Sequence, residues 1–367
     1  MSIKAGLVGL PNVGKSTLFN ALTRSSVPAE NYPFCTIEPH IAITEVPDKR
    51  IPNLVKIYQS KKIIPADVMF ADIAGLVKGA AQGEGLGNQF LSHIREVDLI
   101  IHVLRCFEDP NIVHSQEKID PLEDFDTIEQ ELMLKDLESL EKRNQKINKQ
   151  LKSNISPAEK KTLTQEKEIL KEILGAIDNL DATKVREIIQ RTKLDTLSLI
   201  SSKNFLIIAN LQEADVSQEE NNPYYQKLVE KFGTDKVIPL CVKLESELTQ
   251  LSEEDGKEMM VELGISEAGI DTVIRKTYEN LGLITFFTCG PKETHAWPIK
   301  KGINIRQASG EIHSDLERGF ICSEIINCTS IFELGSEAKA REAGKIKTEG
   351  RDYIVEDGDI VFIKFNV

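Results

Sequence analysis

The chain has 367 residues, with 45 lysines and arginines against 58 aspartates and glutamates, which gives a formal net charge of −13. This length is enough for two or three domains with cores of their own, and 41% hydrophobic with 28% charged residues is an ordinary globular mixture. The acidic balance excludes a protein that binds nucleic acid over its whole surface, although a local basic face remains open.

The six cysteines are scattered along the chain and form no C-x-x-C pair. Several stand among apolar residues, which favours reduced, buried thiols in a cytosolic protein. The first residues show no signal-peptide pattern, and no apolar run approaches membrane-spanning length. We therefore expect a cytoplasmic protein without membrane contact, and we expect it to be a monomer.

A short apolar strand near the start of the chain is followed by a glycine-rich loop. Residues 9–17 read GLPNVGKST, the pattern G-x-x-x-x-G-K-[ST], with a helix expected directly after it. The two glycines of the pattern let the backbone approach an anion, and Lys15 brings positive charge to the β- and γ-phosphates. Ser16 offers a hydroxyl to Mg²⁺. The residues expected to hold a nucleotide's phosphates are Asn12, Val13, Gly14, Lys15, Ser16 and Thr17.

A second apolar strand runs into the sequence D-I-A-G at residues 72–75. D-x-x-G is a weak pattern alone, and a plain turn at a strand end is the alternative. Downstream of a phosphate loop, however, this is where a nucleotide hydrolase keeps the aspartate of its Mg²⁺ site. The N–H of Gly75 would meet the γ-phosphate. Thr36, in a proline-rich loop between the two motifs, completes the expected Mg²⁺ set of Ser16, Thr36 and Asp72.

Residues 126–199 change character, because apolar residues recur there at helical spacing among many charged ones. The sequence S-P-A-E at residues 156–159 combines an N-cap, a proline at the first helical position and a capping-box glutamate. Two long amphipathic helices joined by a short break predict an antiparallel hairpin, with the apolar stripe as its core.

The α/β pattern resumes in strands at residues 205–209 and 237–241, so the helical segment is an insertion. From residue 283 onward strong strands alternate with turns, which predicts a mixed α+β domain of about 85 residues. The expected domains are a phosphate-loop nucleotide-binding domain of residues 1–125 and 200–282, an inserted helical coiled-coil domain of residues 126–199, and a C-terminal domain of residues 283–367.

Residues 210–213 read N-L-Q-E, at the place where a translation-factor GTPase carries N-K-x-D. In that motif the lysine packs on guanine, and the aspartate accepts hydrogen bonds from its N1–H and 2-amino group. Leu211 removes the charge here, and Glu213 is one methylene longer, which misplaces the carboxylate. The residues therefore predict a weakened preference for guanine.

Together these runs resemble the YchF (Obg-like ATPase) family over essentially the full chain. The matching runs are residues 9–17, 31–39, 72–80, 84–88 and 210–213. The resemblance implies a phosphate-loop domain with an inserted coiled coil and a C-terminal TGS domain, a β-grasp module. It also implies hydrolysis of ATP in preference to GTP, with Asn210 and backbone groups around Leu211 binding the base. Association with the ribosome or its RNA, and regulation of translation or stress responses, are further implications.

One departure from the family pattern is Cys241-Val242-Lys243, where such proteins usually carry Ser-Ala and a variable residue. Backbone contacts to the base could survive this change. A basic group in the C-terminal domain allows a local RNA-facing surface beside Trp297, although a solvated surface is the alternative. This group consists of Lys292, Lys300, Lys301, Arg306, Lys345, Lys347 and Arg351.

Leu76 directly follows D-x-x-G, where many related GTPases place a glutamine that orients the attacking water. Three explanations stay open: slow intrinsic turnover, a partner that completes the site, or another side chain. His114 is the candidate for the last, because a neutral imidazole can orient water; a surface histidine is its alternative, and His93 is a weaker candidate. Asn12 resembles the asparagine of potassium-activated relatives, which adds K⁺ to Mg²⁺ as a candidate cofactor.

Two classes of function remain open at this point. One is an ATPase whose turnover matters, with a GTPase of the same fold as the alternative enzyme. The other is a nucleotide-gated binding module, in which hydrolysis only resets the shape.

Overall fold

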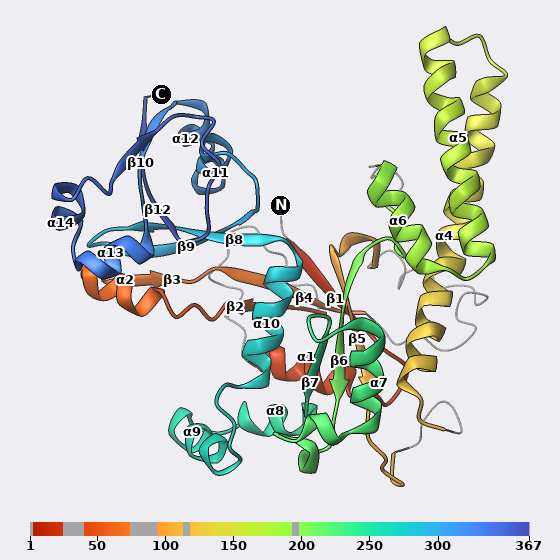
Figure 1. Ribbon diagram of the computed structural model, residues 1–367, viewed down its shortest axis with the longest axis horizontal. Helices are drawn as coiled ribbons and strands as arrows, with labels where there is room; N and C mark the ends of the chain where they lie inside the picture. Colours follow the sequence, from red (N-terminus) through yellow and green to blue (C-terminus); the bar gives the residue numbers. More distant parts are fainter. Residues whose placement is uncertain (1–2, 25–39, 74–93, 113–117, 193–197, 367) are drawn as a thin grey trace. The chain divides into compact units, whose positions relative to one another are not determined.

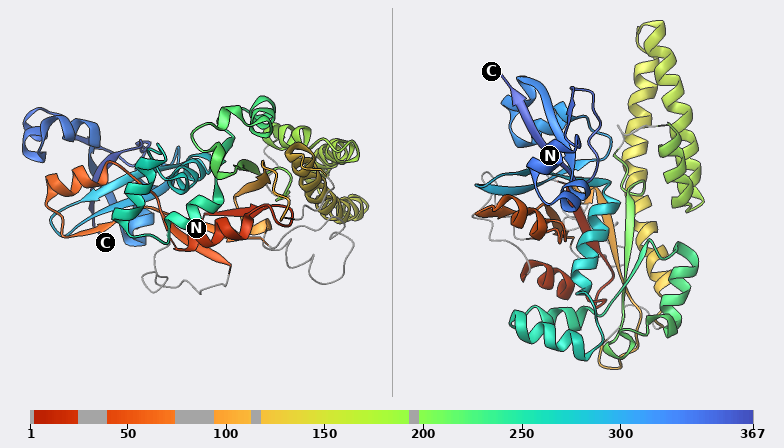
Figure 2. Two further views of the ribbon diagram at one scale, coloured as in Figure 1. Left: turned by 90° about the horizontal axis from the view of Figure 1, so that it is seen from below. Right: turned by 60° about the vertical axis from the view of Figure 1, so that its left-hand side comes forward.

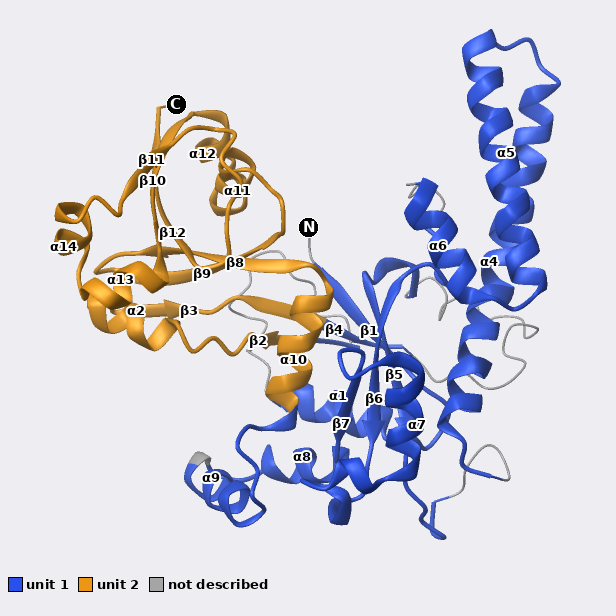
Figure 3. Cartoon of the chain, in the orientation of Figure 1, with its two compact units in different colours: residues 1–24, 37–42, 70–269 blue, residues 25–36, 43–69, 270–367 orange. Residues whose placement is uncertain are grey.

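The computed structural model describes residues 3–24, 40–73, 94–112, 118–192 and 198–366, and it contains two six-stranded sheets (Figure 1). Within these ranges, no helix is both long enough and apolar enough to cross a membrane. The chain divides into two compact units, coloured blue and orange in Figure 3. The first comprises residues 1–24, 37–42 and 70–269, and the second comprises residues 25–36, 43–69 and 270–367.

The first sheet is mixed, because the backbone bonds from Val46 N–H to the Ala66 oxygen and from Asp72 N–H to the His40 oxygen place its first two strands antiparallel. Its strands, in order across the sheet, are β2 (Ile41–Glu45), β4 (Asp67–Asp72), β1 (Lys4–Val8), β5 (Leu99–Arg105), β6 (Asn204–Asn210) and β7 (Val237–Leu240). The run from β1 to β7 pairs in parallel throughout. Every residue of β5 is buried, which explains its apolar sequence, because a central parallel strand is covered on both faces.

The helices of the first unit follow the strands along the chain. They are α1 (Lys15–Arg24), α4 (Pro121–Leu151), α5 (Pro157–Asp178), α6 (Ala182–Thr192), α7 (Pro223–Phe232), α8 (Val242–Leu248) and α9 (Glu253–Glu262). Two short 3₁₀ helices, η4 (Glu213–Asp215) and η5 (Glu219–Asn221), follow β6.

The helices α4 and α5 form the predicted hairpin, and they run side by side in both views of Figure 2. Their interface is apolar, with Leu140 and Ile147 of α4 packed in one cluster with Leu170 and Ile173 of α5. The helix α5 begins as predicted, because Ser156 and Glu159 make the reciprocal hydrogen bonds of a capping box. The helix α4 begins at Pro121, ahead of the predicted residue 126, because the side chain of Asp120 caps it.

The second sheet combines the C-terminal segment with a strand from the first hundred residues. In order, its strands are β11 (Lys347–Glu349), β10 (Phe320–Asn327), β12 (Asp359–Phe365), β8 (Leu283–Cys289), β9 (Glu293–Lys300) and β3 (Lys62–Ile64). The hairpin β8–β9 is antiparallel, and β12 lies parallel beside β8, which is the strand arrangement of a β-grasp sheet. The helices of this unit are α2 (Ile51–Tyr58), α10 (Gly269–Asn280), α11 (Ile305–Ile312), α12 (Ser314–Arg318), α13 (Cys328–Leu334) and α14 (Glu337–Glu342).

These units divide the chain at different residues from the predicted domains. Residues 43–69 group with the C-terminal segment, because β3 pairs in parallel with the edge strand β9. The helical segment groups with the first unit, and residues 270–282 group with the second.

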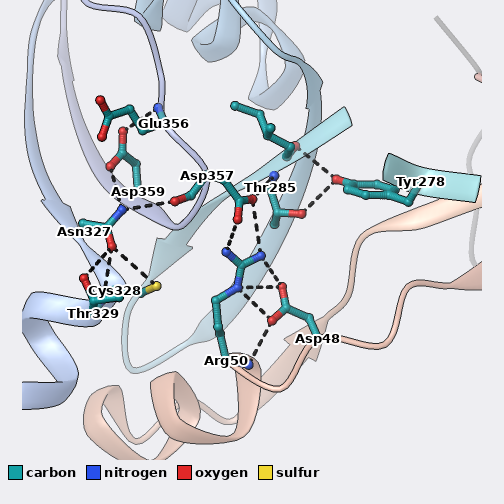
Figure 4. Close-up of polar contacts among 11 residues, drawn as sticks. Asp48, Arg50, Tyr278, Thr285, Asn327, Cys328, Thr329, Glu356, Asp357 and Asp359 are labelled. Atoms are coloured by element: carbon teal, nitrogen blue, oxygen red, sulfur yellow. Dashed lines mark hydrogen bonds and ion pairs between the residues drawn. The ribbon is translucent and has the colours of Figure 1, made fainter. Parts of the chain in front are cut away.

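Arg50 is the polar centre of this grouping (Figure 4). Its guanidinium donates to Asp48 at 2.7 Å and to Asp357 at 2.7 Å, and it lies 5.1 Å from the centre of the Phe287 ring. Asp357 also accepts a hydrogen bond from the backbone N–H of Thr285 at 2.9 Å. One side chain thus connects the start of α2 to two separate parts of the C-terminal segment.

Candidate nucleotide-binding site

The phosphate loop lies between the end of β1 and the start of α1, as its sequence predicts. Gly14 has φ of +98°, and a Cβ atom at this residue would lie 2.4 Å from Nδ2 of Asn210. A Cβ atom at Gly9 would lie 2.9 Å from the carbonyl oxygen of Val103. Neighbouring atoms therefore leave no room for a side chain at either residue, and the positive φ of Gly14 favours glycine as well.

Asn210, the last residue of β6, is hydrogen-bonded to the phosphate loop through its side chain. Its Nδ2 donates to the carbonyl oxygen of Val13 at 2.9 Å, and its Oδ1 accepts from the backbone N–H of Val242 at 3.1 Å. Its side chain is buried, so these bonds are shielded from water. The asparagine of the N-x-x-E motif therefore holds two loops together.

Lys15 and Asp72 lie next to each other, although 56 residues separate them in the sequence. The Lys15 ammonium forms an ion pair with the Asp72 carboxylate, and the two side chains are 8% and 16% exposed. Ser16, the next residue, is exposed. This arrangement brings together a cation for phosphate oxygens, a carboxylate and a hydroxyl.

The oxygens of Ser16 and Asp72 fit a Mg²⁺ ion by their chemistry, since Mg²⁺ prefers hard oxygen ligands and is usually held by few protein groups together with phosphates. Among the described residues, no group of three or more histidine, cysteine or acidic side chains could hold a metal ion.

A cleft of about 660 Å³ begins at the phosphate loop and extends to the N-x-x-E motif. It is lined by Asn12, Gly14, Thr17, Phe107, Glu108, Asp109, Ile112, Asn210, Leu211, Gln212, Glu213, Ala214, Cys241, Val242 and Lys243. Its volume is in the range of small-molecule pockets, and its lining combines apolar side chains with a few polar ones.

The far end of the cleft carries the altered base-reading motif. The backbone N–H of Leu211 donates to the carbonyl oxygen of Leu240 at 2.9 Å, so this N–H is already used within the protein. Glu213 is half-exposed, and its Oε2 lies 3.8 Å from Nζ of Lys243. Burial raises the pKa of the Cys241 thiol, which keeps it protonated at neutral pH.

The structure brings most of the predicted site residues to one place. Asn12, Gly14, Thr17, Asn210 and Leu211 line the cleft. Lys15 and Asp72 form their ion pair, while Val13 accepts the bond from Asn210. Ser16 does not line the cleft and adjoins it in the chain. The predicted residues Thr36, Gly75 and His114, as well as Leu76 and His93, lie outside the described residues.

Sequence reasoning missed the loop of residues 107–112, which forms one wall of the cleft. It also passed over Arg105, a charged residue in an apolar strand whose side chain bonds this loop. An arginine at the end of an apolar strand could have indicated this contact in the sequence, because a charge that is buried with such a strand is costly unless it is hydrogen-bonded.

Two family models match the chain. The 50S ribosome-binding GTPase model matches residues 4–149, and the C-terminal model of YchF GTPases, described as a protein of unknown function, matches residues 283–366. The chain is 44% identical to the ribosome-binding ATPase YchF of Bacillus subtilis and 42% identical to that of Escherichia coli O157:H7, over 100% of both chains in each case. The chain belongs to the YchF family.

The solved structure of the Schizosaccharomyces pombe YchF GTPase agrees with this assignment. It matches with a TM-score of 0.85 at 36% identity, and the match covers 99% of this chain and 98% of that one. The family resemblance and the predicted fold class are thereby confirmed. The protein is a phosphate-loop NTPase of the YchF family, with an α/β nucleotide-binding domain and the C-terminal YchF domain.

Proposed function

We propose that this YchF-family protein is a Mg²⁺-dependent switch that binds and hydrolyses ATP, associates with the ribosome, and regulates translation or stress responses. The cleft between the phosphate loop and the N-x-x-E motif carries the proposal, because it joins a phosphate cradle to a base site that lacks the guanine-reading pair. The relatives in Bacillus subtilis and Escherichia coli O157:H7 are named ribosome-binding ATPases, and a protein that binds ribosomes works in the cytoplasm.

Preference for ATP over GTP rests on the residues at the base end. Leu211 offers no charge to a guanine ring, and the carboxylate of Glu213 has the ammonium of Lys243 as a neighbour at 3.8 Å. Titration of the protein with ATP and with GTP tests the preference directly. We expect tighter binding of ATP, and equal or tighter binding of GTP would favour the GTPase alternative. Restoring the guanine motif with Leu211→Lys and Glu213→Asp together should shift the ratio towards GTP.

A Mg²⁺ ion at this site would be held by Ser16, Asp72 and, in this proposal, Thr36. When bound, it neutralises developing charge on the phosphate oxygens. Lys15 adds a second positive charge, and the phosphate-loop backbone orients the phosphates. Removal of Mg²⁺ with a chelator should abolish ATP hydrolysis; persisting hydrolysis would overturn this assignment.

The proposal includes slow intrinsic turnover, since Leu76 cannot orient water. His114 is proposed for that role, and the Gly75 N–H for contact with the γ-phosphate. His114→Ala should lower single-turnover hydrolysis while leaving ATP affinity unchanged, and His93→Ala tests the weaker candidate in the same assay. Unchanged hydrolysis would remove His114 from the site. Comparison of rates in potassium and sodium salts tests whether Asn12 helps to hold K⁺.

Ribosome association is tested by co-sedimentation with ribosomes in each nucleotide state. Binding that depends on ATP would support the switch, and equal binding in all states would contradict it. A variant that binds ATP but cannot hydrolyse it separates turnover from gating. Retained biological activity in that variant would favour the nucleotide-gated binding module, in which hydrolysis is only a reset.

A further inference from the structure

Arg105 is a fully buried arginine at the end of β5, with 1% of its surface exposed. No carboxylate among the described residues pairs with it. Within the part of the chain that the structure describes, its guanidinium donates to backbone carbonyl oxygens, those of Phe107 at 3.0 Å, Ile112 at 3.0 Å and Asp109 at 3.2 Å. A buried charge is costly without such bonds, and arginine suits this role because its donors form a rigid fork.

All three acceptors belong to the loop of residues 107–112, and all three of these residues line the cleft. The guanidinium carbon also lies 4.8 Å from the centre of the Phe107 ring. This loop contains no helix or strand, so no regular hydrogen-bond pattern fixes its backbone. Arg105 therefore supplies three bonds that a helix or sheet would otherwise provide.

Two side chains at the start of α7, one of them from its N-cap residue, bond this loop and the residue just before it. The hydroxyl of Tyr224 donates to Glu108 at 2.9 Å, and Nδ2 of Asn222 donates to the carbonyl oxygen of Cys106 at 2.9 Å. The backbone N–H of Cys106 in turn donates to the carbonyl oxygen of Asn210 at 2.9 Å. The loop is thus attached to the N-x-x-E end of the cleft.

We propose that Arg105 is a positioning residue for nucleotide binding, which fixes the cleft wall of residues 107–112 beside the base and ribose. The inference rests on the proposed nucleotide site. Arg105 makes no bond to the phosphate loop, so its contribution is separable from phosphate binding. Ligands that consist of phosphates alone do not depend on this wall.

The test compares ATP with inorganic tripolyphosphate in the full-length protein, by calorimetric titration. Arg105→Met keeps the apolar length of the side chain and removes every donor. We expect ATP to bind about tenfold more weakly, while the affinity for tripolyphosphate stays within about twofold of the unmodified protein. Arg105→Lys keeps one cationic group for the same carbonyls, and it should restore part of the ATP affinity.

Arg186→Met is the matched control, because Arg186 is also a largely buried arginine of the first unit. It bonds Glu129 and the carbonyl oxygen of Lys203, and neither residue lines the cleft. We expect this control to lower stability without changing ATP affinity. If Arg105→Met fails to fold, Arg105→Lys carries the test, with an expected loss of about threefold for ATP alone.

Three results would overturn the inference: unchanged ATP affinity in the Arg105 variants, an equal loss for tripolyphosphate, or an equal loss in Arg186→Met. Failure of the unmodified protein to bind ATP at all is a different result, which would contradict the proposed function itself.

Discussion

Asn210 shows how one side chain can fix the geometry of a binding site without any ligand. Its amide is buried, it bonds Val13 on one side and Val242 on the other, and it leaves no space for a Cβ atom at Gly14. Because both bonds are shielded from water, losing them leaves an unpaired carbonyl and an unpaired N–H.

Asn210→Ala should lower the free energy of unfolding by about 2–3 kcal/mol, since two buried hydrogen bonds are lost. ATP affinity should fall as well, because the phosphate loop loses its attachment to β6. Chemical denaturation and calorimetric titration measure the two effects. Asn179→Ala, at the exposed end of α5, is the control and should change stability by less than about 0.5 kcal/mol. A similar small change for Asn210→Ala would contradict the bridging role.

His295 is a second residue whose surroundings determine its chemistry. Its ring stacks on Trp297 with 3.5 Å between centroids. Burial, and secondly the charge of Lys62, lower its pKa to about 4. His295 is therefore neutral at pH 7 in the folded protein.

This lowered pKa gives a pH dependence with a definite sign. The unfolded chain takes up the proton near the ordinary pKa of about 6.5, whereas folded His295 stays neutral until about pH 4. The stability of the second unit should therefore fall as the pH drops from about 6.5 towards 4. Trp297 is the single tryptophan of the chain, so its fluorescence reports both the unfolding and the stacked imidazole.

His295→Phe keeps a ring against Trp297 and removes the titration. In this variant the loss of stability between about pH 7 and pH 5 should be smaller than in the unmodified protein. Fluorescence of the folded protein should also lose its step near pH 4. A step near pH 6.5 in the unmodified protein would show that the pKa of His295 is not lowered.

At the scale of elements, the helical hairpin and the strand β3 are held in the fold by different interactions. The hairpin carries its own apolar core, and Asp136 of α4 anchors it at the entry to β6 by accepting from the N–H groups of Ile200 and Ser201. The strand β3 has only three residues, and it is held by its parallel pairing with β9.

Arg50→Met should reduce the stability of the second unit by about 2 kcal/mol, because it leaves the partly buried Asp48 without its partner. Asp357→Asn is the matched variant, and it should cost less than about 1 kcal/mol, since Asp357 is half-exposed and its amide oxygen still accepts from Thr285. Chemical denaturation, monitored by the fluorescence of Trp297, compares the stability losses of the two variants. A larger loss for Asp357→Asn would contradict this assignment of the network.

At the scale of the whole molecule, the compact units are not contiguous in sequence. The C-terminal family match covers residues 283–366, yet the second unit also takes residues 43–69 and 270–282. A fragment cut at the family boundary loses β3, α2, Arg50 and Tyr278, whose hydroxyl bonds Thr285 at 2.8 Å.

A fragment of residues 283–367 should therefore be less stable than the same segment within the full chain, because the edge of β9 and one face of the sheet become exposed. Denaturation midpoints from Trp297 fluorescence compare the two. An equal midpoint would show that residues 43–69 add nothing to this unit. The denaturation midpoint of the full chain with Arg50→Met should lie between the midpoint of the fragment and that of the unmodified full chain.

Local sequence patterns were sufficient to predict much of the fold and part of the candidate site. The G-x-x-x-x-G-K-[ST] spacing located the phosphate loop, because its glycines and lysine are needed at fixed offsets whatever surrounds them. The capping box at Ser156 located the start of α5 for the same reason. Thr36, Gly75 and His114 remain predictions, since they lie outside the described residues.

By itself the sequence determined the family, the phosphate loop, the helical hairpin and the loss of the guanine-reading pair, since each depends on residues close together in the chain. Only the tertiary structure decided that Arg105 bonds the cleft wall, that Glu213 faces Lys243, and that residues 43–69 group with the C-terminal sheet. These features depend on strand pairing and packing between distant segments. No spacing along the chain encodes such contacts, because they arise only when the strands take their order in the sheets.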